Sequence, residues 1–291
     1  MRTYDEYRSM VEHALGPMLE SLGAIPEKLL EAMRYSLEAG GKRLRPVMLL
    51  AACEMAGGEA ERALPFACAI EMIHTYSLIH DDLPAMDNDD LRRGKPTNHK
   101  VFGEDLAILA GDGLLNAAAE LMARTALSMA DTRGIRAMEI IMRHAGVTGM
   151  IAGQTKDILS EGEKPREDLV AYIHSHKTAD LLEAPVEAGL ALAGADEKQI
   201  RAGHDYGYHL GLAFQMTDDL LDVTGDAALL GKNTGMDAAL DKMTWVALRG
   251  IDGTEKDAEE QVGLAAEALN SLPWEHGFFE ELVRGIITRN H

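Results

Sequence analysis

The chain has 291 residues with 48 acidic and 28 basic side chains, which gives a formal net charge of −20. So acidic a chain argues against a nucleic-acid binder, which needs a basic face, and any site for an anion has to be locally basic. Cys53 and Cys68 lie in apolar stretches and are expected to be buried thiols, not a disulfide. The polar start of the chain has no signal-peptide pattern, and charged residues or proline interrupt its apolar run at 63–80. We therefore expect a cytoplasmic protein without stable membrane insertion.

Apolar residues recur at helical spacing along the whole chain, while aromatic residues make up 5% of it. No alternating strand pattern longer than four residues occurs, nor any repeat or linker. We expect one all-α domain over residues 1–291, a bundle of roughly ten or more helices. The predicted helices span residues 3–15, 27–39, 45–57, 61–82, 101–129, 133–149, 149–160, 166–193, 197–223, 236–249, 255–270 and 274–289, with Gly16 and Pro17 in the first connection.

The segment GGKRLRP at 40–46 combines a helix end with a helix start. Its two glycines suit the end of one helix and its proline the first turn of the next. A helix N-terminus favours anions, so the basic residues here are candidates for a diphosphate site; the alternative is cations that simply flank a helix end. These basic residues are Lys42, Arg43 and Arg45.

The stretch DDLPAMDNDDLRRG at 81–94 begins with Asp81 and Asp82, at the end of an apolar helix. Adjacent carboxylates repel each other unless cations lie between them, and hard oxygen ligands indicate Mg²⁺ or Ca²⁺. The arginine forks of Arg92 and Arg93 suit phosphate oxygens. The stretch predicts a metal–phosphate site, with a solvated acidic loop as the alternative. An EF-hand is excluded, because an arginine would occupy its invariant glycine position.

Two further segments hold polar residues in apolar helices. His74 lies two turns before Asp81 on the same face, as a site residue or as a satisfied core histidine. In HSHKTAD, His174 and His176 are two residues apart and cannot share a helix face, which argues against a zinc pair. Lys177 needs an anionic partner if it is buried; otherwise it extends to solvent.

A second acidic cluster, FQMTDDLLD, lies at 214–222. Asp218 and Asp222 are one helical turn apart, so their carboxylates share a face, and Asp219 flanks them. The two acidic clusters could face each other across a cavity and hold a shared metal cluster. Lys232, in the glycine-rich loop that follows, could reach an anion, although the loop lacks the Walker A pattern of a nucleotide-binding loop.

Taken together, GGKRLRP (40–46), DDLPAMDNDDLRRG (81–94), HKT (176–178), FQMTDDLLD (214–222) and GKNTG (231–235) resemble the motifs of the trans-isoprenyl diphosphate synthases, also called polyprenyl synthetases. The likeness spans the chain in the right order and is closest to short-chain bacterial enzymes. It implies the isoprenoid synthase fold, with mostly antiparallel helices around a central cavity, and a homodimer as the assembly. It also implies a prenyltransferase that condenses isopentenyl diphosphate with an allylic diphosphate, with Mg²⁺ as cofactor and Mn²⁺ as a substitute.

The resemblance also assigns roles to single residues. The implied metal ligands are Asp81, Asp82, Asp87 and Asp218, with Asp219 and Asp222 direct or through water. The allylic diphosphate would bind Arg92, Lys177 and Lys232, and isopentenyl diphosphate would bind Lys42, Arg45, His74 and Arg93. Thr178 and Gln215 would line the path of the allylic cation.

Three positions depart from the family pattern. Ala152 stands where the first glycine of a GGQ motif is usual, Asp180 where a small apolar residue is common, and Trp245 where a tyrosine is common. None of them removes an implied metal or diphosphate ligand. We expect the Asp180 carboxylate to approach the site.

In the family, an aromatic residue at the place of Tyr76 commonly closes the floor of the cavity at fifteen carbons, and Ser77 is small enough to let a chain pass. The implied main product is farnesyl diphosphate, with geranylgeranyl diphosphate as the alternative and an ordinary core tyrosine as the alternative for Tyr76. A non-catalytic partner subunit is disfavoured because both acidic clusters are complete. A terpene cyclase is disfavoured because GGKRLRP and Arg93 are present.

Overall fold

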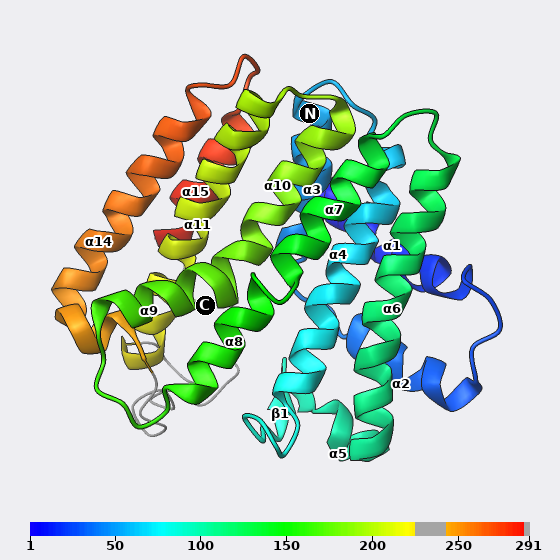
Figure 1. Cartoon of the computed structure of the whole chain (residues 1–291), viewed down its shortest axis with the longest axis horizontal. Coiled ribbons are helices and arrows are strands. Elements are labelled where there is room, and N and C mark those ends of the chain that lie inside the picture. The colour runs from blue at the N-terminus through cyan, green and yellow to red at the C-terminus, as the bar shows by residue number, and fades with distance from the viewer. Residues whose placement is uncertain (225–242, 288–291) are drawn as a thin grey trace. The chain divides into compact units, whose positions relative to one another are not determined.

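A computed structural model describes residues 1–224 and 243–287 (Figure 1). The described residues are helical apart from loops and one hairpin, Leu91–Arg92 (β1) paired with Lys95–Pro96 (β2), so the all-α prediction is confirmed. The chain divides into two compact units, residues 1–139 with 191–194 and residues 140–190 with 195–291. We describe each unit by itself; the single domain and the central cavity stay predictions.

The first unit packs around two apolar helices. Helix α3 is buried on every side from Val47 to Ala52, and α4 lies against it and beside α6 (Figure 1). An all-round apolar helix is expected at the centre of a bundle, where it meets other helices on every face. The helices of this unit are α1 (Tyr4–Glu20), α2 (Glu27–Leu37), α3 (Leu44–Met55), α4 (Ala60–Asp81), α5 (Asn98–Phe102) and α6 (Glu104–Ser128).

The second unit is built on the long helix α11, which packs along α14 and against a π-helix, η1 (Figure 1). Its helices are α8 (Met150–Leu159), α9 (Glu167–Ile173), η1 (His174–Ala179), α11 (Glu197–Thr224), α14 (Trp245–Leu269) and α15 (Gly277–Ile287). The unit boundary falls within α7 (Arg133–Ala145), and α10 (Asp180–Ala193) ends in residues of the first unit.

Two predicted helix boundaries were wrong. Helix α1 continues through Pro17 to Glu20, because Gly16 and Pro17 do not interrupt it, and Gly103 divides the start of the predicted helix 101–129 into α5 and α6. The predicted helix 166–193 is present as α9, η1 and α10 in direct succession, with a π-helical segment in its middle. Helix α14 covers the end of the predicted 236–249 helix and all but the last residue of 255–270, and a kink at Gly250, non-helical with φ 69°, separates the two as predicted.

One described helix, α6, is long and apolar enough to cross a membrane by length and composition. Of its most apolar window, 44% is buried inside the protein. A core helix of a helical bundle meets the same criterion, and α6 packs beside α4 in this way.

Candidate functional site

The first aspartate motif folds back on itself after α4 ends. The N–H of Asp87 donates to the carbonyl of Asp81 at 2.9 Å, so six residues of chain return to their starting point. Asn88 makes the turn possible with φ 53°, in the left-handed region that asparagine tolerates. Asp81 and Asp87 are both half-buried and belong to one short loop. The turn therefore places two of the predicted ligands at the same end of α4.

Asp82 lies behind this turn and is 3% exposed. Its Oδ1 accepts from Arg92 Nε at 3.0 Å and contacts Nη2 of the same guanidinium. Arg92 Nη2 also donates to Asp89 Oδ2 at 3.1 Å. Burial raises the pKa of Asp82, and the charge of Arg92 acts against this. The guanidinium predicted to bind a diphosphate is thus already oriented by two carboxylates.

Arg93 lies against the glycines of the basic segment 40–46. Its Nη1 donates to the carbonyl of Gly40, and a Cβ placed on Gly41 would stand 2.7 Å from its Cζ. Gly41 has φ +125°, a backbone conformation that side chains rarely adopt. The second glycine is therefore required both by the backbone and by the guanidinium packed on it.

A basic cluster surrounds His74 on α4. Burial lowers the pKa of His74 well below its usual value, and the charges of Arg45, Arg93 and Arg92 lower it further. Burial also lowers the pKa of Arg93, and so do the charges of Arg43 and Arg92, against the raising effect of Glu71. Cations that depress one another's pKa mark a place that an anion would stabilise.

Arg43, which lies between Lys42 and Arg45 in the basic segment, is a core residue. Arg43 is 4% exposed, and its Nη1 donates to Glu71 Oε1 at 2.6 Å while its Nη2 donates to the carbonyl of Leu37 at 2.8 Å. Of the other two basic residues, Lys42 is exposed and Arg45 is half-buried.

In the second unit, a chain of hydrogen bonds links the π-helix to α11 and α14. Thr178 Oγ1 donates to Gln215 Oε1 at 2.7 Å, and Gln215 Nε2 donates to Asp219 Oδ1 at 2.9 Å. The other oxygen of Asp219 accepts from the backbone N–H of Trp245 at 2.7 Å. Asp219 is 2% exposed, so its carboxylate holds the start of α14 from inside the unit.

A pocket opens beside these residues. Lys177 Nζ donates to Asp157 Oδ2 at 2.5 Å, so the lysine has the anionic partner that its apolar surroundings required. His174 Nε2 lies 3.4 Å from Asp219, and burial lowers the pKa of His174 to about 3. The pocket is lined by Asp157, Ile173, His174, Lys177, Thr178, Gln215, Asp219, Met243 and Thr244.

The π-helix explains how Lys177 and Thr178 come to the pocket. A π-helix adds a residue to a helical turn and is frequent at functional sites. Two glycines hold it: a Cβ on Gly153 of α8 would stand 2.1 Å from the backbone N of Lys177, and one on Gly211 of α11 would stand 2.4 Å from Ala179 Cα. The usual family glycine replaced by Ala152 is its half-buried neighbour, while the close contact is made at Gly153.

The other carboxylates of the second motif have different exposures. Asp222 is 4% exposed and Asp218 is half-buried, one helical turn before it on α11. Lys232 lies outside the described residues. The sequence did not identify Asp157 as the partner of Lys177, because the two residues are 20 positions apart and lie on different helices.

Two of the three residues that depart from the family pattern, Asp180 and Trp245, have identified partners in the structure. The expectation that Asp180 approaches the site was wrong: its carboxylate contacts His144 and His176, and Asp180 is not among the residues that line the pocket beside Lys177. Trp245 packs its ring on His174, with 5.8 Å between centroids, and its Nε1 donates to Asp257 Oδ2 at 2.7 Å. His174 and His176 therefore face different groups, as their spacing indicated.

Tyr76, on α4, is 6% exposed, and its ring meets His80 edge to face at 5.8 Å between centroids. Burial raises the pKa of Tyr76 to about 12, helped by the charge of Asp81. Within the described residues its hydroxyl has no hydrogen-bond partner. Ser77 Oγ donates to the carbonyl of His74 at 2.9 Å, within the same helix.

Comparison with known proteins gives one consistent family. The model of the family described as "Polyprenyl synthetase" matches residues 26–271. A farnesyl diphosphate synthase of Geobacillus stearothermophilus is 44% identical over 99% of this chain and 97% of its own length. A chloroplastic geranylgeranyl pyrophosphate synthase of Catharanthus roseus is 50% identical over 84% of this chain and 69% of its own. The crystal structure of a geranylgeranyl pyrophosphate synthetase from Pyrococcus horikoshii superposes with a TM-score of 0.88 at 31% identity, covering 98% of this chain and 96% of that one.

Proposed function

The chain belongs to the polyprenyl synthetase family and is a trans-prenyltransferase, and from this premise we propose that it makes mainly farnesyl diphosphate. The proposed substrates are isopentenyl diphosphate and the allylic diphosphates dimethylallyl and geranyl diphosphate. The observation that carries the proposal is the turn at the first motif, in which Asp87 N–H donates to the Asp81 carbonyl at 2.9 Å. That bond brings two half-buried carboxylates to one helix end, beside an arginine that Asp82 orients.

The donor set fits Mg²⁺, with Mn²⁺ as a substitute. The residues in question offer carboxylate oxygens and no sulfur or imidazole, which is what a hard divalent cation prefers. Asp81, Asp82 and Asp87 would hold such ions in the first unit, and Asp218, with Asp219 and Asp222 directly or through water, in the second. When bound, the ions act as Lewis acids that stabilise charge on a departing pyrophosphate. Both carboxylate oxygens of Asp219 accept hydrogen bonds, from Gln215 and from the backbone of Trp245, which favours metal contact through water over direct ligation.

We assign the allylic diphosphate to Arg92, Lys177 and Lys232. The contacts of Arg92 with Asp82 and of Lys177 with Asp157 support this, because a cation held by a carboxylate keeps its direction when a ligand arrives. In the reaction the allylic C–O bond breaks and pyrophosphate leaves with its electron pair. The double bond of isopentenyl diphosphate forms the new C–C bond, and a proton is lost to the pyrophosphate. Thr178 and Gln215 would line the path of the cation.

Isopentenyl diphosphate is assigned to Lys42, Arg45, His74 and Arg93, which need no metal. Burial lowers the pKa of His74 most, and the charges of Arg45 and Arg93 lower it further; these neighbouring cations support the assignment. A neutral His74 keeps one ring N–H to donate to a phosphate oxygen. The packing of Arg93 on Gly40 and Gly41 fixes the direction of its guanidinium.

The length of the product depends on Tyr76 in this proposal. The growing chain would run back from the aspartates along α4, with Ser77 beside its path. Tyr76 lies five residues before Asp81, about 7 Å along a helix axis. Its ring is buried, and its hydroxyl has no hydrogen-bond partner within residues 1–224 and 243–287, which suits an apolar floor better than a polar core contact. Geranylgeranyl diphosphate is the alternative, which the names of several relatives favour. We also propose a cytoplasmic homodimer.

The test is to incubate the purified chain with labelled isopentenyl diphosphate and each allylic diphosphate, with Mg²⁺ or with excess chelator. Chromatography of the dephosphorylated products should show mainly a fifteen-carbon alcohol with Mg²⁺ and none with chelator. A cyclic hydrocarbon would indicate a terpene cyclase, and no product would indicate a non-catalytic subunit. Full turnover in chelator would refute the metal requirement.

A further inference from the structure

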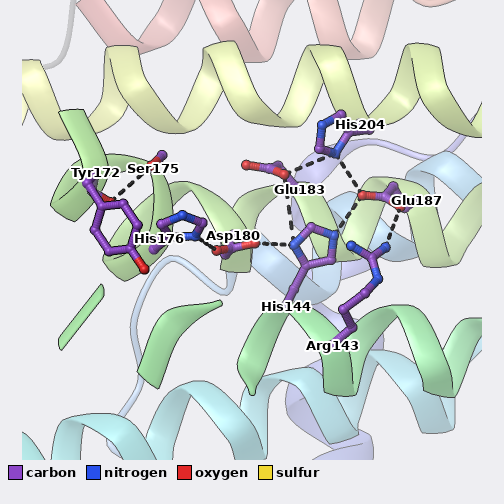
Figure 2. A network of polar contacts seen from close by, with 9 residues as sticks. All are labelled: Arg143, His144, Tyr172, Ser175, His176, Asp180, Glu183, Glu187 and His204. Atoms are coloured by element: carbon purple, nitrogen blue, oxygen red, sulfur yellow. Dashed lines mark hydrogen bonds and ion pairs between the residues drawn. The ribbon is translucent and has the colours of Figure 1, made fainter. Parts of the chain in front are cut away.

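A second group of ionisable side chains, not used in the proposed reaction, gathers in the second unit (Figure 2). His144 comes from α7, Glu183 and Glu187 from α10, and His204 from α11. One donor atom from each lies within 4.8 Å of all the others. We propose that these four residues form a zinc site, separate from the aspartate motifs.

The spacing of the donors is close to that of a tetrahedral site. His204 Nδ1 lies 3.0 Å from Glu183 Oε2 and 3.0 Å from Glu187 Oε1, and His144 Nε2 lies 2.7 Å from Glu187 Oε1. Zinc bonds of about 2.0–2.2 Å to nitrogen and oxygen place tetrahedral donors roughly 3.4 Å apart. Small movements of four side chains would therefore admit the ion.

The atoms around this group are arranged as in the second shell of a metal centre. The carboxylate of Asp180 contacts His144 Nδ1, which leaves Nε2 as the donor that points at Glu187 (Figure 2). Metal-binding histidines nearly always donate their other ring N–H to a carboxylate or carbonyl, and this fixes the tautomer. The other oxygen of Asp180 accepts from His176 Nδ1 at 2.8 Å. Asp180 therefore stands behind His144 as a residue that orients a metal ligand does.

The net charge of the side chains around this group also favours a bound cation. Asp180, Glu183 and Glu187 supply three negative charges, and Arg143 supplies one positive charge through its Nη2, 3.2 Å from Glu187 Oε2. With neutral imidazoles the group keeps two negative charges in a buried place, which a divalent cation balances.

The donors select zinc over magnesium. Imidazole nitrogen suits zinc and related transition metals, whereas Mg²⁺ prefers six oxygens and keeps water. Three of the side chains are almost wholly buried, while the His204 side chain is 41% exposed and offers a path for entry. Four protein donors fill a tetrahedral ion, so the site would be structural and would not bind substrate.

The test uses the full chain, freed of metal and kept in excess Mg²⁺ at pH 8 so that the aspartate motifs are occupied. Co²⁺ is titrated first, because tetrahedral Co²⁺ has characteristic visible absorption, and Zn²⁺ affinity is then measured by competition with a chromophoric chelator. We expect one equivalent of tightly bound metal and a higher melting temperature with Zn²⁺.

His204→Ala and Glu183→Gln should each weaken Zn²⁺ binding at least tenfold, and Asp180→Asn should weaken it about 10- to 100-fold by releasing His144. His209→Ala is the matched control, because His209 is on the same helix but bonds Gln261. Circular dichroism checks that each variant is folded. The proposal is overturned if the parent protein takes up no zinc under these conditions, or if His204→Ala binds it as tightly as His209→Ala does.

Discussion

The guanidinium of Arg93 rests on the backbone of Gly41, where a Cβ would stand 2.7 Å from its Cζ. The two residues come from motifs about fifty positions apart in the sequence, and a side chain at the second glycine of GGKRLRP would collide with the second arginine of DDLRRG. The contact joins the two segments to which we assign isopentenyl diphosphate.

This contact predicts different effects for two neighbouring glycines. Gly41→Ala should displace Arg93 and raise KM for isopentenyl diphosphate at least fivefold, with little change in KM for the allylic substrate. Gly40→Ala is the control, because Gly40 also has positive φ, +85°, but a Cβ there meets nothing within 4 Å. Both variants should lose about 1–3 kcal/mol of unfolding free energy from backbone strain. Equal KM effects in the two variants would refute the role of the contact.

Loss of a carboxylate from either aspartate motif should be severe. Asp81→Ala or Asp218→Ala should lower kcat/KM by at least about two to three orders of magnitude, as removal of a main electrostatic stabiliser does. Steady-state kinetics at saturating Mg²⁺ measures this. Asp90→Ala is the control, since Asp90 is exposed and pairs with Lys100 at 2.7 Å, so its loss should change the rate by less than about twofold. A tenfold loss or less at Asp81 would show that the motif is peripheral.

Product length should respond to the ring of Tyr76 and not to its hydroxyl. Tyr76→Ala should lengthen the product by at least one isoprene unit, because it removes the proposed floor without touching a ligand. Tyr76→Phe should leave the product unchanged, because no described residue bonds the hydroxyl. Chromatography of the dephosphorylated alcohols decides between the outcomes. An unchanged product in Tyr76→Ala would place the floor on another residue.

The π-helix should depend on one glycine of α8. Gly153→Ala puts a methyl group 2.1 Å from the Lys177 nitrogen, so the backbone of η1 has to move. We expect a loss of about 1–3 kcal/mol of unfolding free energy, as overpacking costs, together with a lower kcat. Urea unfolding and steady-state kinetics measure the two effects. The control is Ala152→Gly, which restores the usual family glycine at the neighbouring position and should leave kcat unchanged. If Gly153→Ala changed neither stability nor kcat, η1 would not hold Lys177 in place.

Sequence alone determined the class of the protein. Apolar spacing of 3.6 residues and few aromatics predicted helices throughout, and α3, α4 and α6 begin within about three residues of the expected positions. The aspartates, arginines and glycines of the ordered motifs predicted the family, because their chemistry is local to short segments. The helix end before Pro84 was likewise predictable, since proline cannot continue a helix.

Tertiary structure decided what each polar side chain contacts. Arg43 and Arg45 look alike in GGKRLRP, yet Arg43 pairs with Glu71 in the core, 28 positions along the chain. The π-helix at His174–Ala179 was not predictable, because its extra residue is stabilised by the close approach of Gly153 and Gly211 from other helices. The contact of Asp180 with His144 was not predictable for the same reason. The direction in which a side chain points depends on how distant segments pack, and helical periodicity within one segment does not encode that packing.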